Sequence, residues 1–195
     1  MFPPNINNLI ELFGKFPGIG PRQAARFVFY LFSKSQAELD ELAEKIKEIS
    51  KQFHTCPVCL TITDNTVLLC HICRDQQRNK EKLCIVEKDY DIQNIENAHI
   101  YDGLYFVVGK INITNDQPNA LIEKLMETIK NNKNLMEIII ALNPTTKGDA
   151  ATMYIEKKLK NSGKKISRLG RGLPFGGEIE YADEITLANS FKNRG

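Results

Sequence analysis

The segment KFPGIGPRQAARF, residues 15–27, separates two stretches whose apolar spacing predicts helices. Gly18 and Gly20 allow backbone conformations that other residues disfavour, and Pro21 suits the first helical position, where its missing N–H costs nothing. Such a turn leaves backbone N–H groups unpaired at a helix N-terminus, which favours a bound phosphate. The segment therefore predicts a helical hairpin that contacts a phosphate backbone.

Cations surround this hairpin. Residues 12–37 contain no Asp or Glu, and Arg22 and Arg26 stand four residues apart, on one face of the second helix. Backbone and arginine contacts of this kind hold phosphates without reading bases. The alternative is a tight helix–helix turn without a ligand. The candidate DNA-binding residues are Lys15, Gly18, Gly20, Arg22 and Arg26.

Two CxxC pairs, CPVC and CHIC, follow the helical region and are ten residues apart. Four thiolates from two turns suit a tetrahedral Zn²⁺, and they leave no open coordination position, so the predicted site is structural. The linker is long enough for a small β-hairpin. A chance arrangement or a redox pair remains an alternative, and His54 and His71 are close enough in sequence to act as ligands. The predicted zinc ligands are Cys56, Cys59, Cys70 and Cys73.

The rest of the chain alternates strands with helices, which predicts a parallel sheet covered on both faces. The predicted strands are residues 83–87, 105–109, 137–142 and 165–169. The predicted helices are residues 91–97, with Asp91 as a possible cap, a helix from about residue 119, residues 148–161 and residues 183–193.

Composition limits the classes of protein. The net charge is only +2, and no apolar run reaches the roughly 18–20 residues of a membrane helix. The first residues lack the pattern of a signal peptide, so we expect a cytoplasmic protein without membrane contact, whose cysteines are metal ligands or ordinary core residues rather than disulfides. A second acid-free stretch, residues 157–177, is either a solvated helix face or a polyanion contact.

Glu87 ends the first predicted strand of the alternating part, which resembles the Toprim domain of topoisomerases, primases and related nucleases. In those enzymes this Glu and an Asp-x-Asp pair after a later strand hold Mg²⁺. Asn143 and Thr145 stand at the corresponding positions here, and their side chains are poor Mg²⁺ ligands. The resemblance implies a Toprim fold without catalysis. The alternative is an active nuclease or primase-like enzyme that uses Glu87 and Asp149.

The order of the motifs resembles the RecR family of bacterial recombination mediators over nearly the whole chain. The matching segments are FPGIGPRQAARF, CPVC…CHIC…R, LCIVE, ALNPTTKGDAATMYI and SRLGRGLPFGGEIEYADEITLANS. The resemblance implies an α+β chain of four parts. These are a helix-hairpin-helix region at residues 1–53, a Cys₄ zinc motif at 54–78, a Toprim domain with a mostly parallel sheet at 79–168, and a C-terminal Walker-B-like segment and helix at 169–195.

The family forms ring-shaped tetramers that encircle DNA. With RecO, and in some settings RecF, they help to load RecA onto gapped DNA coated with single-strand-binding protein. The resemblance therefore implies that Lys15, Arg22 and Arg26 face DNA inside a ring and that the four cysteines bind Zn²⁺. One segment departs from the family. Residues 109–121, GKINITNDQPNAL, replace a G-x-L-S-P-x-x-G segment, so the partner contact of that loop is not implied for this chain.

Overall fold

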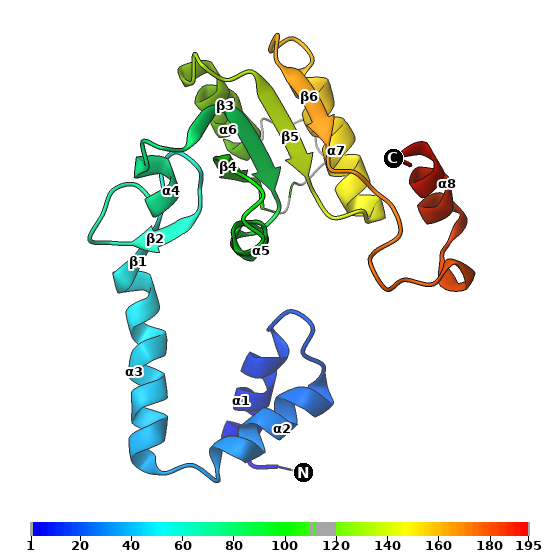
Figure 1. The fold of residues 1–195 in the computed structure, drawn as a ribbon. Helices are drawn as coiled ribbons and strands as arrows, with labels where there is room; N and C mark the ends of the chain where they lie inside the picture. The colour runs from blue at the N-terminus through cyan, green and yellow to red at the C-terminus, as the bar shows by residue number, and fades with distance from the viewer. Residues whose placement is uncertain (1, 110, 112–119, 195) are drawn as a thin grey trace. The chain divides into compact units, whose positions relative to one another are not determined.

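The computed structural model describes residues 2–109, 111 and 120–194, and it forms two compact units, Met1–Phe53 and His54–Gly195 (Figure 1). Most of the segment predicted to depart from the family, residues 109–121, lies outside the described residues. None of the described helices is long and apolar enough to cross a membrane.

The first unit is helical, as predicted. It contains α1 (Pro4–Gly14), α2 (Pro21–Leu31) and α3 (Gln36–Gln52). The α1 and α2 helices pack as a hairpin around Ala24 and Val28, whose side chains are fully buried, and the rings of Phe13 and Phe27 lie 6.0 Å apart between their centroids. The α3 helix begins at a capping box, in which the Ser35 hydroxyl accepts from the Glu38 N–H and the Glu38 carboxylate accepts from the Ser35 N–H.

The cysteine-bearing segment contains β1 (Phe53–Thr55), β2 (Ile62–Asp64) and α4 (His71–Arg74). The linker between the cysteine pairs, which is long enough for a small β-hairpin, contributes one strand, because β2 pairs with β1, which precedes the first cysteine pair. The Asp64 carboxylate accepts from the Thr66 N–H at 2.7 Å, and this side-chain turn ends the strand before a second one can form.

The predicted parallel sheet is confirmed. It contains β3 (Asn79–Val86), β4 (Gly103–Val107), β5 (Glu137–Ala141) and β6 (Lys165–Arg168), in the order β4-β3-β5-β6, and every neighbouring pair is parallel. Within the register, Cys84 stands opposite Tyr105 on one side and Ile139 on the other. All strands therefore end at one edge of the sheet, and there the Toprim-type residues collect.

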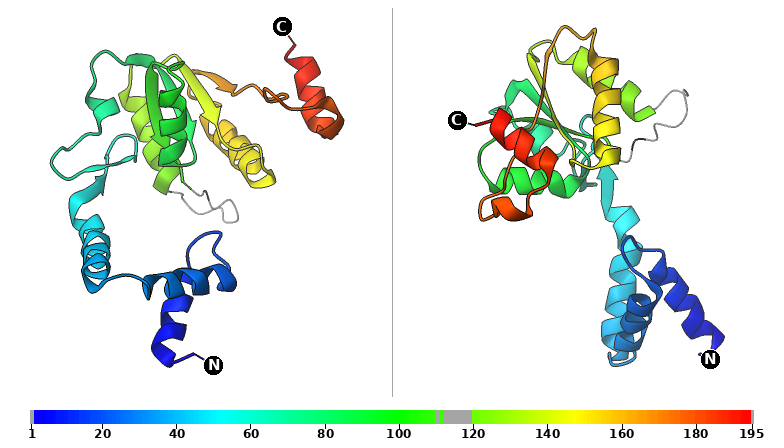
Figure 2. Two further views of the ribbon diagram at one scale, coloured as in Figure 1. Left: turned by 60° about the horizontal axis from the view of Figure 1, so that its bottom comes forward. Right: turned by 90° about the vertical axis from the view of Figure 1, so that its right-hand side faces the viewer.

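The two faces of the sheet pack against different partners (Figures 1 and 2). On one face Leu83, Ile85 and their neighbours pack against α6 (Ala120–Asn131) and α7 (Thr146–Leu159). On the other face the alternate residues Cys84 and Val86 pack against the cysteine motif and against Ile92 of α5 (Asp89–Asn97). The cysteine motif is thus one of the layers that cover the sheet.

The N-terminus of α5 differs slightly from the expectation. Its N-cap is Lys88, and Asp91 lies three residues inside the helix. The Asp91 carboxylate accepts from the Lys88 N–H at 2.8 Å, so it satisfies an unpaired donor from within the first turn. Asp91 therefore supports the helix start without being the cap residue.

A charged network joins the cysteine motif to the sheet. The Arg78 guanidinium donates twice to the Glu96 carboxylate, once at 2.9 Å, and the Tyr105 hydroxyl donates to the same carboxylate at 2.6 Å. The Arg78 side chain is only 16% exposed and that of Glu96 25%. The Arg78 guanidinium lowers the pKa of Glu96, so the pair is charged at neutral pH.

The C-terminal segment folds back on itself. It contains the short 3₁₀ helix η1 (Ile179–Tyr181) and α8 (Glu184–Lys192), which Asp183 caps. The Leu173 N–H donates to the Ser190 hydroxyl at 2.9 Å, and the Asn193 amide donates to the Arg171 carbonyl at 2.8 Å. These bonds hold α8 against residues 171–173, which follow β6.

We expect Arg78→Met to lower the free energy of unfolding by about 1.5–3 kcal/mol, because the change leaves the largely buried Glu96 carboxylate without its charged donor. The lowered pKa of Glu96 means that the pair stabilises the fold above the ordinary Glu pKa of 4.5 and loses that effect as pH falls. Urea unfolding at pH 7 and at about pH 3 measures both effects.

Arg74→Met is the matched control, because Arg74 is exposed in α4 and its side chain bonds to no described residue. This variant should change stability by less than about 0.5 kcal/mol. Equal losses for the two variants at pH 7, or a loss for Arg78→Met that does not shrink in acid, would contradict the role given to the network.

Candidate nucleic-acid interface and metal centre

The hairpin between α1 and α2 is built from a short series of backbone hydrogen bonds. The Phe16 N–H donates to the Phe13 carbonyl at 3.1 Å, and the Ile19 N–H donates to the Phe16 carbonyl at 3.1 Å. Gly18 has a φ of 78°, a left-handed conformation that favours glycine, so this residue is required by the turn itself. Ile19 is half-buried below the turn.

The N-terminus of α2 is open to an external acceptor. Its N-cap is Gly20, no side chain caps it, and no acid occupies its first turn, while Pro21 removes one donor. The φ of Gly20, −82°, is accessible to other residues, and a Cβ there would meet no atom within 4 Å. Gly20 is therefore needed neither for the backbone conformation nor for internal packing, and it leaves room for a group from outside the unit.

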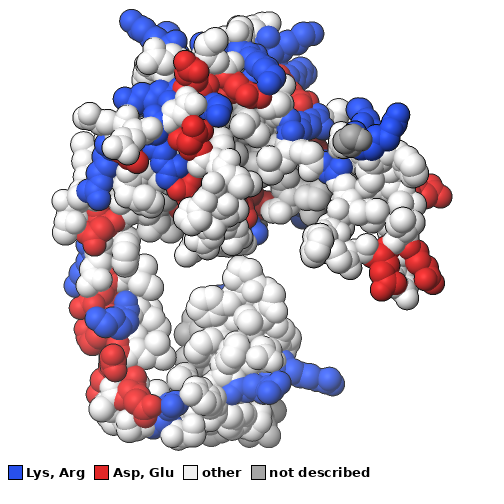
Figure 3. All heavy atoms as spheres, in the orientation of Figure 1, with Lys and Arg blue, Asp and Glu red and all other residues white. Residues whose placement is uncertain are grey.

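The three predicted cations lie around this opening. Lys15, Arg22 and Arg26 are exposed, and within the described residues their side chains form no hydrogen bond or ion pair. In Figure 3 the cations over α2 project from a surface of uncharged residues, while acids gather along α3. The structure thus brings the five predicted residues together in one turn and helix face. Their contact with DNA remains a prediction.

The four cysteines form a compact cluster. All four sulfur atoms lie within 4.8 Å of one another, with 3.4 Å between Sγ of Cys59 and Sγ of Cys70. One pair lies in the turn where the Leu60 N–H donates to the Cys56 carbonyl at 3.0 Å, and the other lies at the start of α4, whose N-cap is Cys70. Zn–S bonds of about 2.3 Å place tetrahedral sulfurs roughly 3.8 Å apart, so the cluster fits a zinc site.

The electrostatics of the cluster also favour a cation. A hydrogen bond from Cys59 lowers the pKa of the Cys70 thiol, while the same contact raises the pKa of Cys59. The pKa of Cys73 is raised mainly by hydrogen bonds with Cys59 and Cys70, then by burial, and also by repulsion from these neighbouring thiolates. A bound metal ion removes this repulsion and allows all four thiolates.

The two candidate histidine ligands lie outside the cluster. The His54 ring nitrogens are within hydrogen-bond distance of the Asn65 side-chain oxygen, at 3.0 Å, and of the Leu68 carbonyl, at 3.2 Å. Among the described residues, the only group of three or more His, Cys, Asp or Glu side chains placed to hold a metal is the four-cysteine cluster. Cys84 lies in the adjacent core, where burial raises its pKa to about 12.

The Toprim-type residues meet where β3 and β5 end. The Asn143 amide donates to the Glu87 carboxylate at 3.0 Å, and the Lys88 ammonium lies 3.9 Å from the same carboxylate. The Thr145 hydroxyl accepts from the Gly148 N–H at 3.1 Å and so caps α7. The Asn143 side chain therefore forms a hydrogen bond to Glu87 that a carboxylate at position 143 would replace with repulsion, while Thr145 serves as the N-cap of α7.

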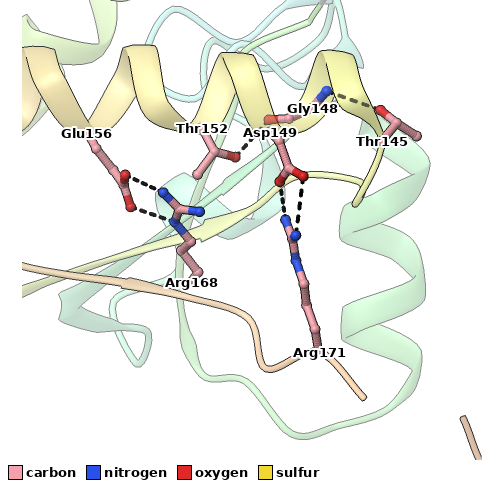
Figure 4. Close-up of polar contacts among 7 residues, drawn as sticks. All are labelled: Thr145, Gly148, Asp149, Thr152, Glu156, Arg168 and Arg171. Carbon is pink, nitrogen blue, oxygen red and sulfur yellow. Dashed lines mark hydrogen bonds and ion pairs between the residues drawn. The ribbon is translucent and has the colours of Figure 1, made fainter. Parts of the chain in front are cut away.

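Asp149 is held by the C-terminal segment. The Arg171 guanidinium donates twice to the Asp149 carboxylate, once at 3.3 Å (Figure 4). Two turns further along α7, the Glu156 carboxylate accepts twice from Arg168 of β6, once at 2.6 Å. Arg171 lowers the pKa of Asp149. Both pairs join residues more than ten positions apart, and the sequence analysis missed them because no periodic pattern marks such contacts.

Three family models match the chain in succession. They are the RecR helix-hairpin-helix, matching residues 6–50, the Toprim domain, matching residues 81–170, and the RecR C-terminal region, matching residues 172–194. Two of the three are specific to one family, and together they span most of the chain.

Similar proteins cover nearly the full length. A protein from Dehalococcoides mccartyi named Recombination protein RecR is 40% identical over 97% of this chain and 93% of its own. Proteins of the same name from Bifidobacterium adolescentis and Staphylococcus aureus are both 37% identical, the first over 97% of this chain and 94% of its own, the second over 99% and 98%.

We expect Cys59→Ser to release the metal and to lower the free energy of unfolding by about 4 kcal/mol or more, because binding energy in so small a motif is also folding energy. Elemental analysis of purified protein and urea unfolding measure the two effects.

Cys84→Ala is the control, since Cys84 shares the buried cluster without being one of the four clustered thiols. It should cost about 1 kcal/mol and leave the metal content unchanged. Native protein without bound metal, or full metal content in Cys59→Ser, would contradict the assignment.

Proposed function

The chain belongs to the RecR family of recombination proteins, and we propose that it is a recombination mediator in DNA repair. It binds DNA without sequence preference as an oligomeric clamp in the cytoplasm, at the nucleoid. It acts with RecO and RecF to load RecA onto gapped DNA that is coated with single-strand-binding protein.

The open hairpin is the observation that carries this proposal. The N-terminus of α2 has no side-chain cap, and the side chains of Arg22 and Arg26 pair with no described residue. Backbone N–H groups and arginines fit phosphate oxygens, which repeat identically along DNA whatever its sequence. Both features support a grip on the DNA backbone by Lys15, Gly18, Gly20, Arg22 and Arg26.

Two uncovered apolar surfaces support a homo-oligomer, which we propose is a tetramer. On α3, Leu42, Ile46 and Ile49 are each at least 45% exposed. In the C-terminal segment the exposed apolar side chains are those of Phe175, Ile179, Tyr181, Ile185 and Phe191. A monomer rarely exposes surfaces of this kind, and two separate contacts per chain allow subunits to close into a ring.

A non-catalytic Toprim domain suits a clamp that must hold DNA intact. Mg²⁺ in proteins is bound through carboxylates, whereas Asn143 supplies an amide and Thr145 a hydroxyl that already caps α7. The carboxylate in the first turn of α7, that of Asp149, is neutralised by Arg171. We propose that the metal of this protein is instead a structural Zn²⁺ held by Cys56, Cys59, Cys70 and Cys73.

Arg22→Ala combined with Arg26→Ala should weaken binding to every DNA sequence about tenfold or more at low salt, because two phosphate contacts are lost. The plot of log affinity against log salt should become shallower by about 2. Fluorescence anisotropy with two unrelated duplexes measures both quantities.

Lys45→Ala with Lys47→Ala is the matched control, since these exposed cations of α3 pair with Glu48 and Glu44. The control should bind DNA as native protein does. Unchanged affinity in the arginine variant would contradict the hairpin contact and favour an adaptor that binds only proteins.

Native protein incubated with Mg²⁺ or Mn²⁺ should leave labelled DNA uncut. Asn143→Asp with Thr145→Asp should raise the affinity for these ions, measured by calorimetry, because it restores two carboxylates near Glu87, and Asp at 145 still caps α7. Asn131→Asp with Asn134→Asp adds equal charge elsewhere and should leave ion affinity unchanged. Cleavage by native protein that Glu87→Ala abolishes would refute the non-catalytic assignment.

A further inference from the structure

The edge of the sheet at which the parallel strands begin is a continuous surface. The Met136 N–H donates to the Glu81 carbonyl at 2.8 Å, and the Lys165 N–H donates to the Met136 carbonyl at 2.9 Å. The Asn132 amide also donates to the Lys80 carbonyl at 2.7 Å. These bonds join three segments, residues 79–82, 130–137 and 157–165, which we call the strand-start edge.

The strand-start edge is strongly basic. Its acids are Glu81 and Glu137, and Glu137 is paired with Lys165 at 2.9 Å. In Figure 3 Lys and Arg side chains gather over this end of the His54–Gly195 unit, around the α6–β5 turn and the start of β6. Its lysines are Lys80, Lys82, Lys130, Lys133, Lys157, Lys158, Lys160, Lys164 and Lys165.

Several of these lysines have partners within the protein. Lys164 donates to the Leu135 carbonyl at 2.6 Å, Lys82 pairs with Asp102 at 3.2 Å, and Lys158 lies over the Tyr154 ring at 5.5 Å. Apart from these three and Lys165, which pairs with Glu137, the lysines are exposed and, within the described part of the chain, their side chains form no hydrogen bond or ion pair. They are Lys80, Lys130, Lys133, Lys157 and Lys160.

The two helices that end at this edge explain the presence of only some of the five unpaired lysines. Cations in the last turn offset the negative end of a helix, which accounts for Lys130 in α6 and Lys157 in α7. Lys80 lies on a strand, and Lys133 lies in the turn beyond α6, so neither has this role. Unpaired like charges on one surface repel each other, and an external polyanion removes that repulsion.

The opposite edge of the sheet carries acids among its cations. Glu87, Asp89 and Asp91 follow β3, and Asp149 lies in the first turn of α7, with Lys88 beside Glu87 and Arg171 beside Asp149. A polyanion that approaches this unit is therefore attracted more strongly to the strand-start edge. The basic segments contain no aromatic side chain on which a base would stack, so their chemistry fits phosphates rather than bases.

We propose that the strand-start edge is a second contact for the nucleic-acid backbone, separate from the hairpin of the first unit. The inference rests on the proposed function, because it assumes that the chain binds DNA. Lys80, Lys133 and the neighbouring exposed lysines neutralise phosphates there, and they contribute affinity and salt dependence without sequence preference.

The test is Lys80→Glu with Lys133→Glu, two changes that spare the helix ends, measured by anisotropy over a series of salt concentrations. We expect DNA affinity to fall about tenfold and the salt slope to become shallower by about 2, with unchanged urea unfolding. Lys80→Arg with Lys133→Arg should bind as native protein does. Lys147→Glu with Lys192→Glu, which makes the same change of net charge elsewhere, should weaken binding far less.

The outcomes separate the two sites. Native affinity in the Lys80/Lys133 reversal, with lost affinity in the Arg22/Arg26 variant, would overturn this inference and leave the proposed function intact. Native protein without DNA affinity would overturn both. An equal loss in the Lys147/Lys192 control would show a general charge effect and also overturn the inference.

Discussion

The packing of the four-cysteine motif against the sheet is the constraint on which the second unit depends. Cys56, Cys59 and Cys70 share one buried cluster with Cys84, Val86 and Tyr105, and the Val107 N–H donates to the Cys59 carbonyl at 2.8 Å. Removal of the motif would expose much of one face of the sheet to water. The four-cysteine cluster and the hydrophobic core of this unit therefore form together, so a metal ion bound by the cysteines would be coupled to the folding of the domain.

Two ion pairs tie further segments of the chain to the helices beside the sheet. Arg78 joins the end of the cysteine motif to α5 through Glu96, and Arg171 joins the C-terminal segment to α7 through Asp149. Arg171 places its guanidinium beside Asp149, in the first turn of α7 and close in sequence to Asn143 and Thr145. These contacts tie the elements around the sheet to the cysteine motif and to the C-terminal segment.

Local patterns in the sequence were sufficient for much of this structure. The CxxC pairs, the Gly-rich hairpin and the apolar strands are each defined within a few residues, and the structure contains the cysteine cluster, the helical hairpin and the parallel strands. The start of β3 was placed at residue 83, four residues late, because Asn79–Lys82 is polar and exposed. That part is a strand because Asn79 pairs with Gly103 and Lys82 with Glu137, which are distant in the sequence.

Contacts between distant residues were beyond the reach of sequence patterns. The pairs Arg78–Glu96 and Arg171–Asp149, and the bond from the Ile62 N–H to the Asp89 carboxylate at 2.8 Å, have no periodic signature. The second acid-free stretch was left open between a solvated face and a polyanion contact. In the structure its cations fall into two groups. Partners within the protein are present for Lys164, Lys165, Arg168 and Arg171, whereas Lys157 and Lys160 have none among the described residues.

Retention on circular DNA tests most directly whether the protein holds DNA as a clamp without cutting it. Protein loaded onto covalently closed circular DNA would be challenged with high salt and then treated with a restriction enzyme that opens the circle once. A clamp predicts that the protein stays on the intact circle, with the mass of an oligomer, and leaves soon after the circle is opened. Equal dissociation rates from circular and linear DNA, or circles cut by the protein itself, would contradict it.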